Sequence, residues 1–222
     1  GLVGHVPLYG HFFRCARRLD APSIDCLTSA PPQVPWHVAR MIGSIADLEG
    51  RTVTMCEVSD HSQRYRPAGD TRPIRIVTED EIRGTCNRLV WGGINTLTSY
   101  YAFQDLTDEQ LRRINTQVGR CQTMMRGGHQ VTDIAVLYPI ESVWPAFIPA
   151  YQGATTEPAA RRIESVFHGV TSALYAANRD FAYADSQALR EAKVIDDMLA
   201  HGGQRWRVLV LPAADTLPLK AW

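Results

Sequence analysis

A repeated alternation of short apolar runs with amphipathic helical patterns is the feature that most constrains this chain. A strand-like run over residues 21–29 precedes a helical pattern over 35–51, in which apolar residues recur three and four positions apart. A second apolar run over 52–58 follows that helix directly, whereas the connections from strand to helix are long. Because parallel strands must be joined by crossover segments, this order predicts an α/β fold built from parallel βα units.

The same unit recurs before residue 128. Helices are expected over 78–93 and 106–128, and a strand over 94–103 lies between them. Each helix begins with a capping box, in which a threonine and a glutamate or glutamine three positions later satisfy backbone N–H groups of the first turn. The two pairs are Thr78 with Glu81 and Thr107 with Gln110.

A second series of alternating elements follows residue 128 and has no evident tie to the first. We therefore expect two domains, over residues 1–128 and 129–222. The second should contain a parallel sheet with helices on both faces, because its strands are nearly continuous apolar runs. Its expected elements are strands over 131–139, 180–185 and 207–212 and helices over 159–178 and 186–200.

Charge and hydropathy limit the partners that the chain can have. The formal net charge of the 222 residues is zero, and no long run of lysine or arginine occurs. Nucleic acid and anionic membrane surfaces are therefore not expected as the main partners. No apolar run approaches the roughly 20 residues that a membrane-spanning helix needs, so a membrane location is not expected either.

The cysteines do not form a recognisable framework. Their number is odd, their spacings are wide and no C-x-x-C occurs, so neither a disulfide scaffold nor a zinc knuckle is expected. We expect free thiols and a reducing compartment such as the cytoplasm. The five cysteines are Cys15, Cys26, Cys56, Cys86 and Cys121.

The familiar cofactor and catalytic motifs are missing. The sequence contains no G-x-G-x-x-G, no G-x-x-x-x-G-K-[ST], no H-E-x-x-H and no G-x-S-x-G, so no cofactor and no metal are expected. The glycine pairs in "RGGHQ" and "HGGQR" each follow an expected helix. We interpret them as helix C-caps rather than phosphate-binding turns.

The stretch "TVTMCEVSDH" contains the best candidate for chemistry. Its apolar run ends at Glu57, and a long polar loop with His61 follows. In a (β/α)8 barrel, the carboxyl ends of the strands form the face that carries the active site. Asp25 and the tyrosines Tyr100 and Tyr101 also lie at the ends of expected strands. These residues would line one mouth, where carboxylates and aromatic rings suit a sugar.

Each of these residues also has a purely structural interpretation. Glu57 and His61 could be solvated side chains without a function, and Asp25 could serve merely as a turn-forming residue. Tyr100 and Tyr101 could fill the core at a strand end. The residue types alone leave both interpretations open.

Three stretches of the sequence together resemble known enzymes. "SIADLEGRTVTMCEVSDH", "GGINTLTSYYAF" and "RCQTMMRGGHQVTDIAVLYPIESVWPAFIP" are similar to the end of the barrel, and the start of the next domain, in family 42 β-galactosidases and family 106-type α-L-rhamnosidases. Downstream, "FAYADSQAL" and "RVLVLPAADTLP" resemble the flavodoxin-like domain that follows such barrels. The resemblance implies that residues 1–128 are the C-terminal part of a (β/α)8 barrel and that 129–222 begin a flavodoxin-like domain.

The resemblance also implies roles for particular residues. Residues 52–58 would be the seventh barrel strand and 94–100 the eighth. Glu57 would be the catalytic nucleophile of a retaining enzyme, or a base or substrate-positioning group if the enzyme is inverting, as family 106-type enzymes are. The acid/base glutamate would belong to the fourth strand, which this chain does not contain. Asp25, His61, Tyr100 and Tyr101 would contact a carbohydrate substrate, and the flavodoxin-like domain would support a homotrimer.

The sequence therefore predicts part of a retaining, β-galactosidase-like glycoside hydrolase that belongs to a longer polypeptide. About three barrel strands are recognisable where closure needs eight, so we expect the 222 residues alone to be inactive. Two alternatives remain. One is a carbohydrate-binding relative without catalysis, and the other is an unrelated flavodoxin-like α/β module.

Overall fold

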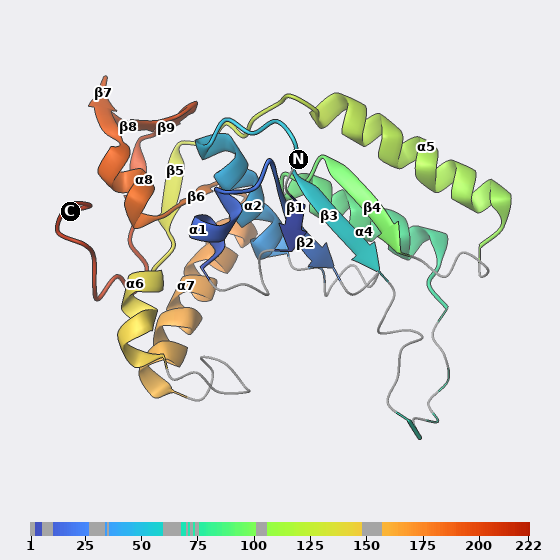
Figure 1. Ribbon diagram of the computed structural model, residues 1–222, viewed down its shortest axis with the longest axis horizontal. Helices are drawn as coiled ribbons and strands as arrows, with labels where there is room; N and C mark the ends of the chain where they lie inside the picture. The colour runs from blue at the N-terminus through green and yellow to red at the C-terminus, as the bar shows by residue number, and fades with distance from the viewer. Residues whose placement is uncertain are drawn as a thin grey trace. The chain divides into compact units, whose positions relative to one another are not determined.

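Contacts along the backbone divide the chain into two units, each of which is described by itself. The first unit comprises Gly1–Ala46 and Arg51–His129, and the second comprises Asp47–Gly50 and Gln130–Trp222. Figure 1 shows the computed structural model of the chain. The structure describes residues 3–5, 11–26, 34, 36–59, 68–69, 71, 73, 76–100, 106–147 and 157–222.

The first unit is built on a parallel sheet. Its strands are β1 (Val3–His5), β2 (Ala21–Cys26), β3 (Met55–Ser59) and β4 (Thr96–Tyr100), and they pair side by side in that order. All three pairings are parallel, which confirms the α/β class predicted from the sequence. The sequence did not reveal β1, because a three-residue strand is too short to show a periodic pattern.

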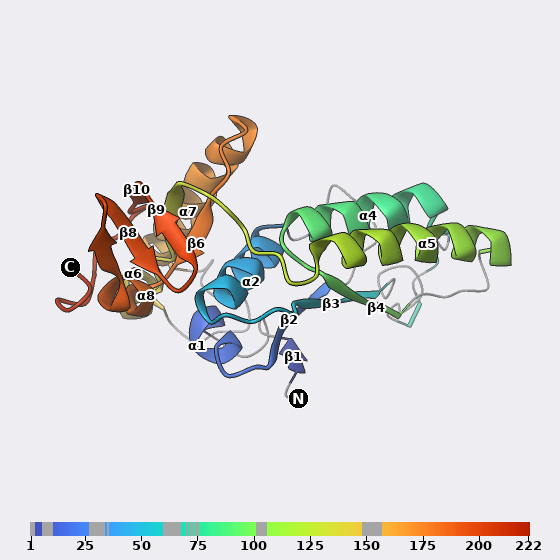
Figure 2. The same ribbon diagram turned by 90° about the horizontal axis from the view of Figure 1, so that it is seen from above.

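Helices cover one side of this sheet. Figure 2 shows α2, α4 and α5 on the same side of strands β2, β3 and β4. The two predicted capping boxes are both present, since the Thr78 and Thr107 side chains accept the N–H groups of Glu81 and Gln110. The helices described in this unit are α1 (Phe12–Ala16), α2 (Trp36–Leu48), α4 (Glu79–Trp91) and α5 (Asp108–Met125).

A buried polar clamp joins the segments that lead into β3 and β4. The Asn95 side chain accepts the Thr54 backbone N–H at 3.1 Å and donates to the Thr52 carbonyl at 2.9 Å. In return, the Thr54 hydroxyl accepts the Asn95 backbone N–H at 3.0 Å and donates to the Gly93 carbonyl at 2.7 Å. Both Thr54 and Asn95 are buried, so the clamp fixes how the two strands start relative to each other.

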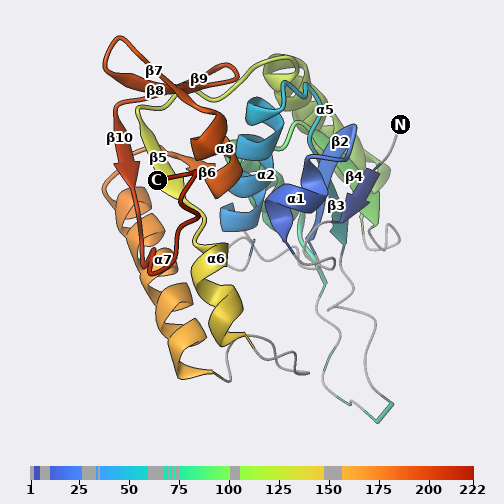
Figure 3. The same ribbon diagram turned by 60° about the vertical axis from the view of Figure 1, so that its left-hand side comes forward.

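The second unit contains a smaller parallel sheet. Its strands are β5 (Ile134–Leu137), β6 (Ala182–Ala184) and β10 (Val208–Val210), in the spatial order β10-β5-β6. The structure thus confirms that the three apolar runs of this region pair in parallel. Figure 3 shows α6 beside α7, and both helices belong to the connection from β5 to β6. The elements between these two strands are α6 (Ile140–Val143), η4 (Trp144–Ala146) and α7 (Pro158–Ala176).

The helix predicted over 186–200 is wrong beyond its first turns. The helix α8 (Ser186–Glu191) ends early, and the chain then forms β7 (Lys193–Ile195), β8 (Met198–His201) and β9 (Gln204–Trp206), an antiparallel meander. The reason lies in the turn between β7 and β8.

Asp196 and Asp197 form that two-residue turn with φ of 51° and 58°, the left-handed conformation that tight hairpins require. The glycine pair in "HGGQR" is likewise not a helix C-cap, because Gly202 (φ 55°) turns the chain between β8 and β9. The pair in "RGGHQ" does follow a helix, and Gly127 there has a φ of 77°.

The clamp makes Asn95 important for stability. Replacing Asn95 by alanine leaves the buried Thr54 N–H without its acceptor, and an unsatisfied buried group costs roughly 1–3 kcal/mol. We expect Asn95→Ala to lower the free energy of unfolding by about that amount in urea titrations followed by circular dichroism.

Asn87→Ala is the matched control. Asn87 accepts a hydrogen bond from Gln117 on the exposed surface of two helices, where water can replace the lost partner. We expect it to change the free energy of unfolding by less than about 0.5 kcal/mol. Equal losses for the two variants would show that the clamp has no special role.

Candidate functional site

A row of polar residues crosses the larger sheet near the carboxyl end of β2 and through the middle of β3 and β4. The prediction that Glu57 ends its strand is therefore wrong, because β3 continues to Ser59. Asp25 on β2 pairs in register with Glu57 on β3, and Glu57 pairs with Thr98 on β4. Residues paired in this way in a parallel sheet project from the same face, and neighbouring strands lie roughly 4.8 Å apart. The structure therefore places two carboxylates and a hydroxyl next to one another on three strands.

This row lies on the face of the sheet that points away from the helices. Cys56 and Val58, on either side of Glu57, are 0% and 1% exposed, whereas Glu57 itself is half-buried. Asp25 is also half-buried, and the adjacent Cys26 is fully covered. Because side chains alternate along a strand, the buried residues face the helices and the carboxylates face the opposite side.

The thiols on the helix side take no part in this row. A hydrogen bond with Cys26 and burial together raise the pKa of the Cys56 thiol, and the nearby Asp25 carboxylate adds to the effect. Cys56 therefore stays protonated and behaves as a small core residue rather than a nucleophile. The chemistry of the site rests on its carboxylates.

The structure brings together only part of the site that the sequence predicted. Tyr100 is the last residue of β4 and pairs with Ser59, but the structure describes only its backbone. His61 and Tyr101 lie outside the described residues. Thr98 was missed, because its position beside Glu57 depends on the register between β3 and β4, which the sequence pattern does not give.

The described part of the chain offers no alternative centre of metal chemistry. No group of three or more histidine, cysteine, aspartate or glutamate side chains within it could hold a metal ion. Two neighbouring carboxylates without a metal can accept hydrogen bonds from hydroxyl groups, and an ionised carboxylate can attack an electrophilic carbon. The row is thus suited to binding, and reacting with, a polyhydroxylated ligand.

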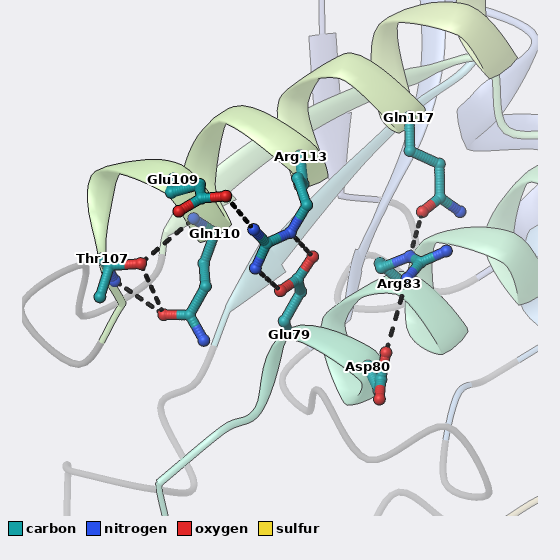
Figure 4. Close-up of polar contacts among 8 residues, drawn as sticks. All are labelled: Glu79, Asp80, Arg83, Thr107, Glu109, Gln110, Arg113 and Gln117. Carbon is teal, nitrogen blue, oxygen red and sulfur yellow. Dashed lines mark hydrogen bonds and ion pairs between the residues drawn. The ribbon is translucent and has the colours of Figure 1, made fainter.

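A second group of charged residues lies on the outer surface of α4 and α5 (Figure 4). Arg113 forms a two-pronged ion pair with Glu79, with N–O distances of 2.9 and 2.6 Å, and its remaining nitrogen bonds Glu109 at 2.9 Å. The hydrogen bonds from Arg113 lower the pKa of the Glu79 carboxyl below its ordinary value of 4.5. The same pairing raises the pKa of Arg113, so both groups remain charged at neutral pH.

Comparison with known proteins assigns the chain to no family. No protein-family model matches the chain, and no curated protein matches it. Among the helices that the structure describes, none has both the length and the apolar character needed to cross a bilayer.

The titration of the Glu79 carboxyl group measures the strength of its ion pair with Arg113. Because the folded pKa of Glu79 is lowered, the pair stabilises the fold above pH 4.5 and loses its effect as the pH falls through the folded pKa. We expect the NMR-detected pKa of Glu79 to rise towards 4.5 in Arg113→Gln.

The stability of this variant should show the same pH dependence. The difference in unfolding free energy between the wild type and Arg113→Gln should shrink as the pH falls and vanish below the folded pKa of Glu79. An unchanged Glu79 pKa in Arg113→Gln would contradict this interpretation. Arg112→Gln serves as the control, since Arg112 makes no ion pair within the described residues.

Proposed function

We propose that this chain is part of a retaining, β-galactosidase-like glycoside hydrolase, in which Glu57 is the nucleophile. The observation that carries the proposal is the row of Asp25, Glu57 and Thr98, in register on three parallel strands. The described helices α2, α4 and α5 lie on the other side of these strands. In a (β/α)8 barrel, helices surround the outer face of the strands, and the catalytic side chains come from the strands themselves.

In this proposal, β1 to β4 are the last four strands of the barrel. The carboxyl ends of such strands carry the catalytic groups. Glu57 lies two residues before the last residue of β3, so its side chain would point into the barrel below that end. The fourth strand of the barrel, with the acid/base glutamate, would lie outside these residues. The resemblance of "CEVSDH" and "GGINTLTSYYAF" to family 42 and family 106-type enzymes supports the same assignment.

The chemistry follows from two carboxyl groups. The acid/base residue would protonate the glycosidic oxygen while the Glu57 carboxylate attacks the anomeric carbon and forms a glycosyl-enzyme ester. Water, deprotonated by the same acid/base residue, would then break that ester and release the sugar. Asp25 would accept hydrogen bonds from the hydroxyls of the sugar, and Tyr100, Tyr101 and His61 would complete the binding surface.

The strand order of the second unit supports the proposal that it is a flavodoxin-like domain. Its first strand, β5, lies in the middle of the order β6-β5-β10, and flavodoxin-like sheets begin in the same way. By resemblance, this domain would hold the enzyme as a trimer.

One residue of this unit argues against an independent nucleotide-binding module. The buried Glu141 lies in the first turn of α6, directly after β5, and accepts a hydrogen bond from Ser186. A phosphate bound at this helix start would meet a negative charge, whereas nucleotide sites favour backbone N–H groups without one.

The test is an assay of the complete protein that contains these residues, with an activated nitrophenyl glycoside. Glu57→Gln keeps the shape of the side chain but removes the nucleophilic charge. We therefore expect turnover to fall by several orders of magnitude, roughly 10⁴-fold or more, while substrate binding is largely retained. Glu164→Gln on α7 is the matched control and should keep wild-type turnover.

Azide identifies the role of the carboxylate. In Glu57→Ala, azide can occupy the vacated space and attack the anomeric carbon, which yields a glycosyl azide of opposite anomeric configuration. A glycosyl azide that retains the configuration would instead assign Glu57 as the acid/base. Near-normal turnover of Glu57→Gln would exclude Glu57 and favour a binding protein without catalysis.

A further inference from the structure

The outer faces of α4 and α5 form a groove whose walls are rich in arginine. The groove has a volume of about 510 Å³, and its lining includes Arg83 from α4 and three arginines from α5, Arg112, Arg113 and Arg120. Glu79 is its one acidic lining residue. The two helices run side by side along it, as Figure 2 shows.

The distribution of charge along both helices is uneven. All their acidic residues lie in the first turn, where they cap the helix and favour its positive end. Beyond the first turn, neither helix contains an aspartate or glutamate. The arginines that follow there are Arg83 and Arg88 in α4 and Arg112, Arg113 and Arg120 in α5.

The arginines of the groove differ in what they contact. Arg113 is occupied by Glu79 and Glu109, and Arg83 contacts Gln117 and Asp80 (Figure 4). Arg112 and Arg120 have no side-chain partner among the described residues, and both are exposed. The groove therefore presents two guanidinium groups whose hydrogen-bond donors are open to a ligand.

The spacing of these two arginines limits the kind of ligand. They are eight residues apart in one helix, and Thr116 lies midway between them on the same face. With a rise of 1.5 Å per residue, their backbones are separated by about 12 Å along the helix axis. One small anion cannot bridge that distance, but an extended chain that carries several anionic groups can.

We propose that the groove between α4 and α5 binds a linear polysaccharide that carries carboxylate or sulfate groups. Arg112 and Arg120 would each bind one anionic group, while Thr116 and Gln117 would bind sugar hydroxyls between them. The choice of a saccharide as the bearer of the charge rests on the proposed glycoside hydrolase function. The groove lies on the helix side of the sheet, so it is separate from the Glu57 row.

Because the net charge of the chain is zero, any binding of a polyanion points to a local cluster of positive charge. A chain with a formal net charge of zero does not attract polyanions as a whole, so binding must come from a local arrangement of charges. Arginine also suits the task, because its planar guanidinium group forms two parallel hydrogen bonds to a carboxylate or a sulfate-like oxyanion.

Titration calorimetry of the 222-residue chain tests the proposal. The probes are dextran sulfate, polygalacturonate and neutral dextran at low ionic strength. We expect binding to one or both anionic polymers and none to neutral dextran. The double variant Arg112→Gln/Arg120→Gln should bind roughly tenfold or more weakly, because two charge-assisted contacts are lost.

The matched control is Arg179→Gln/Arg190→Gln in the second unit. It removes the same charge from exposed positions outside the groove and should bind the polymers as the wild type does. Circular dichroism verifies that both double variants are folded. Equal weakening in the two double variants, or no binding by the wild type, would overturn the proposal.

Two further probes separate the alternatives. Inorganic sulfate should not compete at equal charge concentration, because it cannot span both arginines. Poly-glutamate that binds more tightly than both polysaccharides would overturn the saccharide assignment and indicate an acidic peptide as the partner. None of these measurements requires turnover, so a failure of the Glu57 assignment would leave their result unaffected.

Discussion

The arrangement of the candidate site depends on the clamp between Asn95 and Thr54. The side chains of a strand alternate between its two faces, so a shift of β4 against β3 by one residue would move Thr98 to the helix side. The four hydrogen bonds of the clamp act at the amino ends of both strands and set their register. The residues that fix the site thus precede β3 and β4, on the amino side of the Glu57 row.

This clamp also explains part of the sequence pattern that resembles barrel enzymes. In "GGINTLTSYYAF", Asn95 joins the strand starts, and Gly93 has a φ of 100° that a residue with a side chain rarely adopts. Gly92 leaves no room for a side chain, since an added carbon atom would lie 2.6 Å from the Ala39 side chain. These glycines therefore let the turn between α4 and β4 pack closely against α2.

Local signals explain which elements could be predicted from the sequence. The helices α4 and α5 were predictable because each combines a capping box with apolar residues three and four positions apart. The meander after α8 was not, because residues 186–200 also fit a helical pattern and only the left-handed turn at Asp196 and Asp197 interrupts it. For the site, Asp25 lies near a strand end as predicted, whereas the apolar run before Glu57 hid that β3 continues to Ser59. Their partner Thr98 depends on register between strands, which a single sequence does not encode locally.

The first unit separates opposite charges onto the two sides of one sheet. Asp25 and Glu57 face away from the helices, while the arginines of α4 and α5 lie on the outer surface of those helices. The packed layer between them, with buried Ile82, Cys86 and Ile114, keeps the two groups from neutralising each other directly. A chain with no net charge can in this way present a carboxylate surface suited to sugar hydroxyls and an arginine surface suited to anionic groups. Within a closed barrel the sheet has no edge, so one polymer would reach both surfaces only over the rim of the barrel.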